Sequence, residues 1–474
     1  MNTFMMNIET YLNSLPINTK NINLSDQNLL VLPDLSKFKD LEELNCSGNN
    51  LSSLPILNNN LKILYCSNNN ITSLPPLNEN LEIINCEGNI LSSLPTLNKN
   101  LKILYCNSNR LLNLPILNDK LEEIYCINNI LTSLPDLNFN LKILCCNINN
   151  LSSLPKLNNN LKILKCNYNE LSSILELNEN LEELYCTNNR INNIVSLNNN
   201  LRILHCSFNN LSYLPPLNNN LKVLHCSSNK LLYLPVLNDL LEDLYTNNNL
   251  LTWIPPLNNN LKILYCNNNS LTNLPLLNIN LIKLFCNNNA LTNISQLNDN
   301  LEELYCANNI ISNIDAINNN LIILHCNANK LLRLPPLNNN LKQLKCNHNI
   351  LLSLPLLNTN LKQLNCSNNE LSHLPLLNDN LLVLYYHNNP IYPIITINNY
   401  LHNDIHIIKN NIRVLNNFKL TYFLLKYKKQ FTKWYWKSQE QKIINKYSPD
   451  NLIHIINNND NILDNETLNL IEQW

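Results

Sequence analysis

The sequence predicts a repeat solenoid with a curved parallel β-sheet on its concave face and an extended, polyproline-like convex side. Asparagine occupies every twentieth position from Asn49 to Asn389, eighteen times in succession. Around it the chain repeats L-x-x-L-x-C-x-x-N-x-L-x-x-L-P-x-L-N-x-N. A strict 20-residue period with apolar residues at fixed offsets indicates one rung per repeat, because a single rung cannot bury its own apolar face.

Residues 1–21 precede the regular array and are predicted to cap it. A short helix around Ile8 to Leu12 would cover the open edge of the first strand. Residues 22–40 form an atypical rung with Gln27 at the asparagine register. The solenoid is therefore expected over residues 22–400, as one atypical rung and eighteen rungs of 20 residues.

The rung from Leu61 to Asn80 illustrates how each repeat is expected to fold. A short strand over Ile63–Ser67 would alternate inward and outward side chains. Asn69 follows the strand, where its amide can donate to and accept from the backbone of adjacent rungs. Pro75 makes the return segment extended. The inward set of this rung is Leu61, Leu64, Cys66, Ile71, Leu74 and Leu77.

Sixteen of the seventeen cysteines share one register, from Cys46 to Cys366, with Thr246 and Tyr386 in the remaining rungs. A free cysteine behaves as a small buried hydrophobe, so we expect a ladder of reduced thiols in the core. Disulfides or metal sites would need paired, irregular spacings. Cys145 lies off the ladder and is expected to be exposed on the concave face. There it is either a plain thiol or one whose pKa is lowered by Lys165.

These repeats resemble the leucine-rich repeat family, in particular its short 20-residue class found in bacterial type III secreted effectors. The return segment reads LPxLN where those effectors have LPxLP. The asparagine-rich composition is most similar to that of leucine-rich repeat proteins of giant DNA viruses, which suggests a viral protein. The resemblance implies a solenoid whose concave face binds proteins, and it implies no enzymatic activity.

No catalytic motif accompanies the repeats. The chain has only two glycines, Gly48 and Gly88, so a phosphate-binding glycine loop is not expected. The ubiquitin-ligase domain of some similar effectors needs a cysteine after the repeats, and none follows Cys366. We therefore expect no enzyme, no cofactor and no small-molecule substrate. The N-terminus lacks the pattern of a signal peptide, no apolar run could span a membrane, and the thiols indicate a reducing, cytoplasmic location.

The outward strand register is rich in aromatic and histidine residues, which makes it the predicted partner-binding site. Tyrosine has an apolar ring with a polar tip and is favoured at protein interfaces. The alternative is that aromatic residues simply favour strands and stack along them. The predicted site consists of Tyr105, Tyr125, Tyr185, His205, His225, Tyr245, Tyr265, Phe285, Tyr305 and His325. His205 and His225 are neighbours, but they lack a third ligand, so no metal site is expected.

A column of alternating charge, beginning Glu42, Lys62 and Glu82, flanks this register and is expected to support strand pairing. Acidic pairs such as Glu122-Glu123 recur every third rung and could meet a basic partner, although a solvated face is the simpler explanation.

Residues 401–474 differ in composition and are predicted to form a basic, helical C-terminal region. Residues 401–450 hold ten Lys or Arg against three acidic residues. Ser448-Pro449 is typical of a helix start. This region is either a cap with a solvated basic face or a module for an anionic partner, whether acidic protein, nucleic acid or membrane surface. No other part of the chain is expected to bind nucleic acid. The leading hypothesis is a protein-interaction scaffold. The alternatives are an effector or ubiquitin-ligase adaptor acting through the tail, and a structural virus-particle component.

Overall fold

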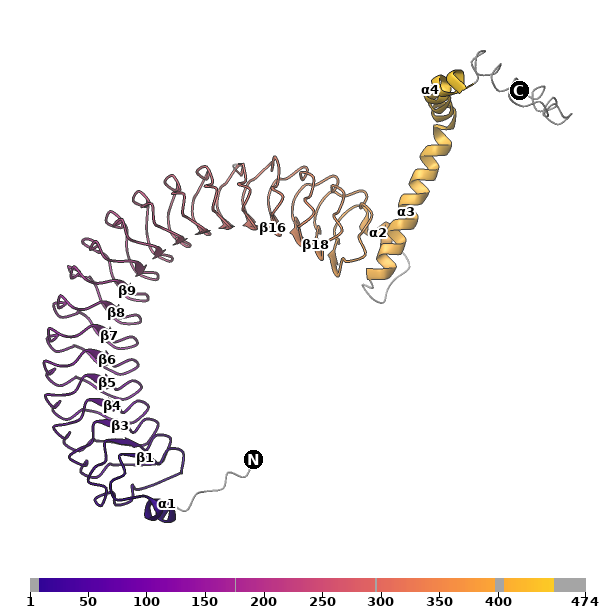
Figure 1. Cartoon of the computed structure of the whole chain (residues 1–474). Helices are drawn as coiled ribbons and strands as arrows, with labels where there is room; N and C mark the ends of the chain where they lie inside the picture. Colours follow the sequence, from indigo (N-terminus) through magenta and orange to yellow (C-terminus); the bar gives the residue numbers. More distant parts are fainter. Residues whose placement is uncertain (1–7, 175, 295, 397–404, 447–474) are drawn as a thin grey trace. The chain divides into compact units, whose positions relative to one another are not determined.

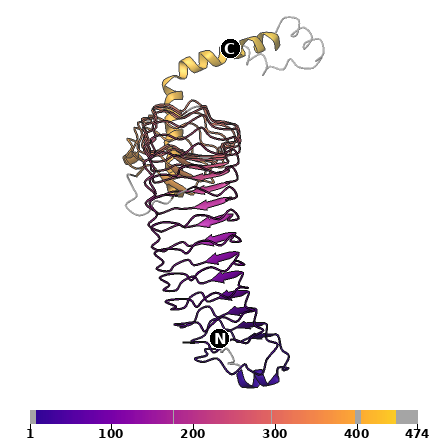
Figure 2. The same cartoon turned by 90° about the vertical axis from the view of Figure 1, so that its left-hand side faces the viewer.

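The computed structural model describes residues 8–174, 176–294, 296–396 and 405–446. Its repeat region is a solenoid in which nineteen parallel strands form one sheet on the inner side of an arc (Figure 1). Consecutive strands pair in sequence order, so the chain advances by one strand per rung (Figure 2). The predicted fold class is confirmed.

Each strand is three residues long, shorter than the five expected from Ile63 to Ser67. The chain leaves the strand early because the residue at register 68 turns left-handed. The strands are β1 Asn21–Asn23, β2 Glu43–Asn45, β3 Ile63–Tyr65, β4 Ile83–Asn85, β5 Ile103–Tyr105, β6 Glu123–Tyr125, β7 Ile143–Cys145, β8 Ile163–Lys165, β9 Glu183–Tyr185, β10 Ile203–His205, β11 Val223–His225, β12 Asp243–Tyr245, β13 Ile263–Tyr265, β14 Lys283–Phe285, β15 Glu303–Tyr305, β16 Ile323–His325, β17 Gln343–Lys345, β18 Gln363–Asn365 and β19 Val383–Tyr385.

The core consists of stacked columns of leucine, isoleucine and cysteine. In the rung that begins at Leu61, the side chains of Leu61, Leu64, Cys66 and Ile71 are almost completely buried. Leu74 and Leu77, on the return segment, are half-buried. All sixteen ladder cysteines are buried and carry free thiols. Identical side chains at one register thus form a continuous apolar core.

An asparagine ladder ties neighbouring rungs together beside the core. The Nδ2 atom of Asn69 donates to the carbonyl oxygens of Cys46, Cys66 and Ser67 at 3.0, 3.2 and 3.2 Å. Its Oδ1 atom accepts from the N–H of Leu51 at 3.0 Å. The predicted role of this asparagine register is confirmed, since it satisfies backbone groups at the turn that would otherwise be buried without partners.

The residue before each ladder asparagine adopts a left-handed conformation, with φ between 52° and 66° at this register from Gly48 to Asn388. Asparagine and glycine tolerate this region, whereas bulky side chains are strained there. Asparagine fills many of these turns, as its abundance suggests. Ile148, Tyr168 and Phe208 also adopt it, and their side chains are about half exposed.

Two further asparagine ladders run along the L-N-x-N end of each repeat. The Nδ2 atom of Asn258 donates to Asn238 O and Leu241 O, each at 2.8 Å. The Nδ2 atom of Asn260 donates to Asp239 O at 2.8 Å. Each rung is thus bonded to the preceding one through several side-chain amides.

Helix α1, Ile8–Ser14, lies at the N-terminal end of the solenoid, where the sequence predicts a capping helix. Its residue Leu12 is buried, and the Lys37 Nζ atom donates to the Leu12 carbonyl oxygen at 3.0 Å. At the other end, Tyr386 replaces the ladder cysteine, is buried, and packs against Tyr392 with ring centroids 5.3 Å apart.

The C-terminal region is helical, as the sequence predicts. It contains α3 Ile405–Lys426 and α4 Lys428–Lys446, and α2 Tyr392–Thr396 precedes it, within the range predicted for the solenoid. Exposed apolar side chains on α3 include Phe418, Tyr422 and Leu425. In the described part of the chain, no helix is both long and apolar enough to cross a membrane. The predicted helix start at Ser448-Pro449 lies outside the described residues.

Candidate protein-binding surface

The third residue of each strand faces the concave side and forms a continuous column across the sheet. Strand pairing places Tyr245 beside Tyr265, Tyr265 beside Phe285, and Phe285 beside Tyr305. The middle residue of these strands is a buried leucine, and the two flanking residues are half-buried. We call the unbroken run on this column the aromatic stripe: Tyr185, His205, His225, Tyr245, Tyr265, Phe285, Tyr305 and His325.

The rings of the aromatic stripe contact one another along its whole length. Tyr245, Tyr265, Phe285 and Tyr305 are stacked with centroids 4.5, 4.1 and 4.2 Å apart and planes within 10° of parallel. Tyr185 and His325 close the two ends with edge contacts. Stacked aromatic pairs contribute about 0.5–1.5 kcal/mol each beyond their burial, so the stripe also stabilises the sheet.

Tyr105 and Tyr125 form a separate stacked pair, with centroids 4.7 Å apart. Cys145 and Lys165 occupy the two rungs between this pair and the stripe. The structure therefore divides the ten predicted residues into a group of two and a group of eight.

The histidines of the stripe are held in their neutral form. His205 and His225 stack with centroids 3.9 Å apart and planes at 12°. Burial lowers the pKa of His205, and burial together with the nearby His205 lowers the pKa of His225 to about 4. Lone pairs of parallel stacked rings point side by side and cannot converge on one ion. In the described residues, no group of three or more His, Cys, Asp or Glu could hold a metal.

The expectation that Cys145 is exposed is wrong. Its side chain is only 3% exposed, because it is short and lies between the longer Tyr125 and Lys165 of the paired strands. Burial raises the pKa of its thiol to about 11 despite the nearby Lys165. The Lys165 ammonium instead lies over the Tyr185 ring, 5.0 Å from its centroid. Cys145 is therefore no activated nucleophile.

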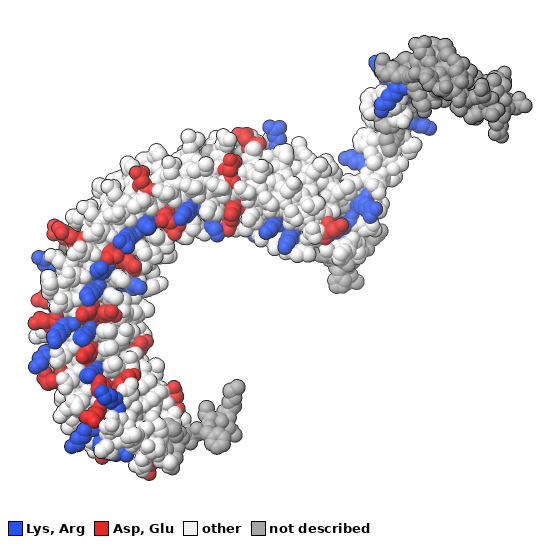
Figure 3. Space-filling model, viewed as in Figure 1, with Lys and Arg blue, Asp and Glu red and all other residues white. Residues whose placement is uncertain are grey.

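The second position of most rungs, beside the stripe, is charged. Charged side chains form a band along the solenoid (Figure 3). Opposite charges of neighbouring rungs pair, for example Glu42 with Lys62 at 2.7 Å and Glu122 with Lys142 at 2.6 Å. In two of the acidic pairs, Glu122-Glu123 and Glu182-Glu183, the second acid accepts a hydrogen bond from the outward tyrosine of its own strand. The hydroxyls of Tyr125 and Tyr185 donate to Glu123 and Glu183 at 3.0 Å. These acids hold two tyrosine tips in place.

A further exposed aromatic group lies outside the predicted site. Tyr213, Tyr233 and Trp253 occupy one register in three successive rungs and are 40%, 49% and 51% exposed. These residues can be found by comparing the repeats, because the same register holds serine or asparagine in most other rungs. Sequence reasoning centred on the strand missed this group.

The described part of the C-terminal region presents basic side chains to solvent, among them Lys426, Lys428 and Lys429. Within 405–446 the sequence holds ten Lys or Arg and one acidic residue, Glu440. An anionic partner of this region would meet many exposed cations.

Comparison with solved structures identifies the repeat architecture. YopM from Yersinia enterocolitica is 30% identical, with 77% of this chain and 91% of YopM covered and a TM-score of 0.64. A leucine-rich repeat protein from Leptospira interrogans is 26% identical, with coverages of 72% and 93% and a TM-score of 0.56. The functional domain of InlJ from Listeria monocytogenes, which includes a cysteine ladder, is 26% identical, with coverages of 62% and 69% and a TM-score of 0.53.

No family model and no curated protein sequence matches the chain. The similarity to YopM nevertheless extends over most of both chains. In this chain the 20-residue repeat forms the buried columns and the asparagine ladder. The chain belongs to the leucine-rich repeat family.

Proposed function

We propose that the protein is a non-enzymatic scaffold that binds a protein partner on its concave face, in a reducing, cytoplasmic setting. The aromatic stripe carries this proposal. It presents eight contiguous rings, half-buried yet accessible from the concave side, on a sheet whose strands are bonded rung to rung. Repeat solenoids use such concave surfaces for binding, and aromatic residues dominate binding energies at interfaces.

The decisive experiment separates binding from sheet stabilisation. The variant Tyr245→His/Tyr265→His/Phe285→His keeps a flat ring at each rung, as His205 and His225 already do, but removes the larger tips. Full-length tagged protein and this variant would be used to capture partners from cell extract, with quantification by mass spectrometry. We expect the specific partner to be lost, while the melting temperature changes by only a few degrees.

The matched control is Tyr213→Ser/Tyr233→Ser/Trp253→Ser, which removes three exposed aromatic residues outside the stripe. We expect this control to retain the partner. If the stripe variant folds and captures the same partner as the wild type, the stripe only holds strands together and the proposal is wrong.

A second candidate is an effector or ligase adaptor that recruits another component through the C-terminal region, and the exposed lysines of α3 and α4 favour it. Replacing Lys426, Lys428 and Lys429 with alanine would then remove that component and spare the partner of the stripe. The loss should be larger at low salt than at high salt, because salt screens exposed charges.

A further inference from the structure

The charge column beside the aromatic stripe is internally paired over most of its length. Every residue at this register from Lys20 to Lys262 is charged and takes part in an ion pair with a neighbouring rung. The last of these joins Lys262 to Glu242 at 2.6 Å. Each charge of this part of the column thus already has an oppositely charged partner in a neighbouring rung.

The pairing stops after Lys262. Isoleucine occupies the register at positions 282 and 322, on both sides of Glu302. Backbone bonds fix this order, since the N–H of Glu302 donates to Ile282 O at 2.9 Å and the N–H of Ile322 donates to Glu302 O at 2.8 Å. Over the described residues, neither Glu302 nor Lys342 forms an ion pair. The nearby Lys283 is engaged by Glu303 at 2.9 Å.

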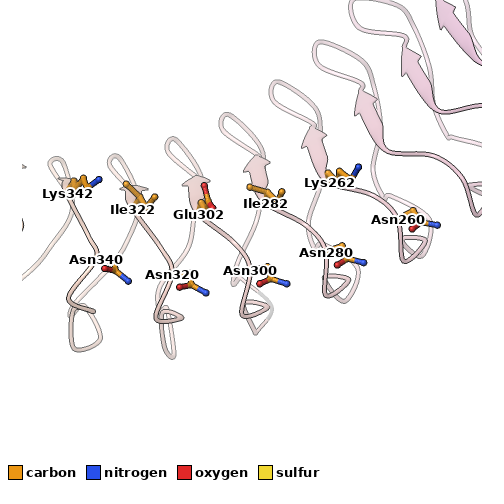
Figure 4. Close-up of a pocket in the computed structure, with 10 residues that line it drawn as sticks. All are labelled: Asn260, Lys262, Asn280, Ile282, Asn300, Glu302, Asn320, Ile322, Asn340 and Lys342. Atoms are coloured by element: carbon orange, nitrogen blue, oxygen red, sulfur yellow. The ribbon is translucent and has the colours of Figure 1, made fainter.

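A groove of about 390 Å³ runs along these rungs (Figure 4). One wall is the charge column from Lys262 to Lys342, and the other is a row of asparagines: Asn260, Asn280, Asn300, Asn320 and Asn340. The Nδ2 atoms of Asn300 and Asn320 donate to carbonyl oxygens of preceding rungs at 3.0 and 2.9 Å. These bonds fix the amides and leave their Oδ1 atoms as acceptors.

We propose that this groove binds an extended peptide segment of a protein partner, anchored by an arginine on Glu302. The carboxylate of Glu302 supplies the opposite charge, and the half-buried Ile282 and Ile322 on either side pack against the aliphatic stem. An arginine carries five N–H donors in a planar fork. The fixed asparagine oxygens can accept hydrogen bonds from the N–H groups that do not bond to the Glu302 carboxylate. The proposal deepens the proposed function and rests on it, because it names the kind of partner segment that lies beside the stripe.

Lys342 extends the recognition to a second charge. It lies two rungs beyond Glu302, a separation of about 10 Å at the spacing of parallel strands. A polyproline-II segment has three residues per turn and advances about 3.1 Å per residue, so an acidic residue three positions from the arginine lies on the same side, roughly 9 Å along, and would reach Lys342. The preferred ligand therefore contains one arginine and one acidic residue three positions apart.

The test uses defined peptides and the full-length protein. Fluorescence anisotropy would measure binding of labelled peptides that hold Arg and Glu three positions apart, in both orders, in an otherwise alanine and serine sequence. We expect the peptide with one of these two sequence orders to bind at least tenfold more tightly than the same peptide with Gln in place of Arg. The Ile282→Lys variant should weaken it at least tenfold, because a lysine beside Glu302 restores the pairing seen in the other rungs.

The matched control is Glu122→Gln, which changes a carboxylate at the same register that already pairs with Lys142. This variant should bind the peptide as the wild type does, while Glu302→Gln should not. Equal binding by the wild type, Ile282→Lys and Glu302→Gln, or no binding by any peptide, would overturn the proposal. These peptide measurements do not depend on partner capture by the stripe variant. The groove proposal can therefore fail while the stripe proposal holds, and the reverse.

Discussion

The side chain of Asn209 bonds to Cys186 of the preceding rung, with 2.9 Å between its Nδ2 atom and the Cys186 carbonyl oxygen. The same Nδ2 atom donates to the carbonyl oxygens of Cys206 and Ser207 at 3.1 Å, and its Oδ1 atom accepts from the N–H of Ile191 at 2.9 Å. One buried amide therefore satisfies backbone groups of two rungs.

Replacing this amide should destabilise the solenoid markedly. We expect Asn209→Ala to lower the free energy of unfolding by about 1–3 kcal/mol, because it leaves buried backbone groups without partners. Chemical denaturation monitored by circular dichroism would measure the change. The control is Asn210→Ala at the exposed neighbouring position, where surface substitutions usually change stability by less than about 0.5 kcal/mol. Equal losses at both positions would contradict the role of the ladder.

The repeat predicts the inward registers well because eighteen copies of each position report the same environment. The leucine, cysteine and Asn69 columns lie where the sequence places them. The burial of Cys145 was not predictable from its register, since it depends on the size of the side chains in the adjacent strands, Tyr125 and Lys165. A neighbour twenty residues away in sequence decides that exposure.

The candidate site was predictable as a column of residues but not in its contacts. Periodicity indicates that Tyr265 and Phe285 are neighbours, whereas the near-parallel planes of their rings depend on side-chain torsions. The groove beside them depends on the direction of the asparagine amides, which the L-N-x-N pattern does not encode. The break in ion pairing at Ile282 and Ile322 is visible in the sequence, but only once the pairing partners are known.

Thr246 is a weak point of the cysteine ladder. It is fully buried, and its Oγ1 atom has no hydrogen-bond partner. We expect Thr246→Cys and Thr246→Val each to raise the free energy of unfolding by roughly 1 kcal/mol, because they remove an unsatisfied buried hydroxyl. Denaturant titration would measure the gain. Cys266→Thr in the adjacent rung should produce the opposite change, and a loss of stability in Thr246→Val would refute the argument.

The ladder thiols should be inert in the folded protein. All seventeen cysteines are buried and free, and burial raises the pKa of thiols such as Cys206 and Cys266 to about 12. A thiolate is the reactive form, so alkylation should be slow in native buffer and fast in denaturant. Mass spectrometry after a timed pulse of iodoacetamide would locate the modified positions.

Cys145 provides a sharper version of this test. In the Tyr125→Ala variant its thiol loses the large neighbour on the preceding strand, and its alkylation should accelerate at least tenfold. Tyr305→Ala, which removes a stripe ring far from Cys145, should leave that rate unchanged. Alkylation of Cys145 in the wild type as fast as that of an unfolded peptide would show that the thiol is exposed after all.

The stripe histidines should make stability depend on pH between about 4 and 6.5. Burial lowers the pKa of His225 to about 4, and burial together with the nearby Lys345 lowers that of His325 to about 4. An unfolded histidine titrates near 6.5, so in this window the unfolded chain binds more protons than the folded one. Stability is therefore fully present above pH 6.5 and decreases as the pH falls towards 4.

We expect His225 to contribute about 1–2 kcal/mol to this decrease, since its imidazole retains some contact with solvent. The His225→Phe variant keeps a ring between His205 and Tyr245 but cannot bind a proton. Melting temperatures of the wild type and the variant, measured from pH 7.5 to 4.5, should diverge as the pH falls, with the variant retaining more stability at low pH. Parallel curves would mean that His225 titrates normally in the folded protein, and the neutral stacked pair with His205 would then be the wrong description of the stripe.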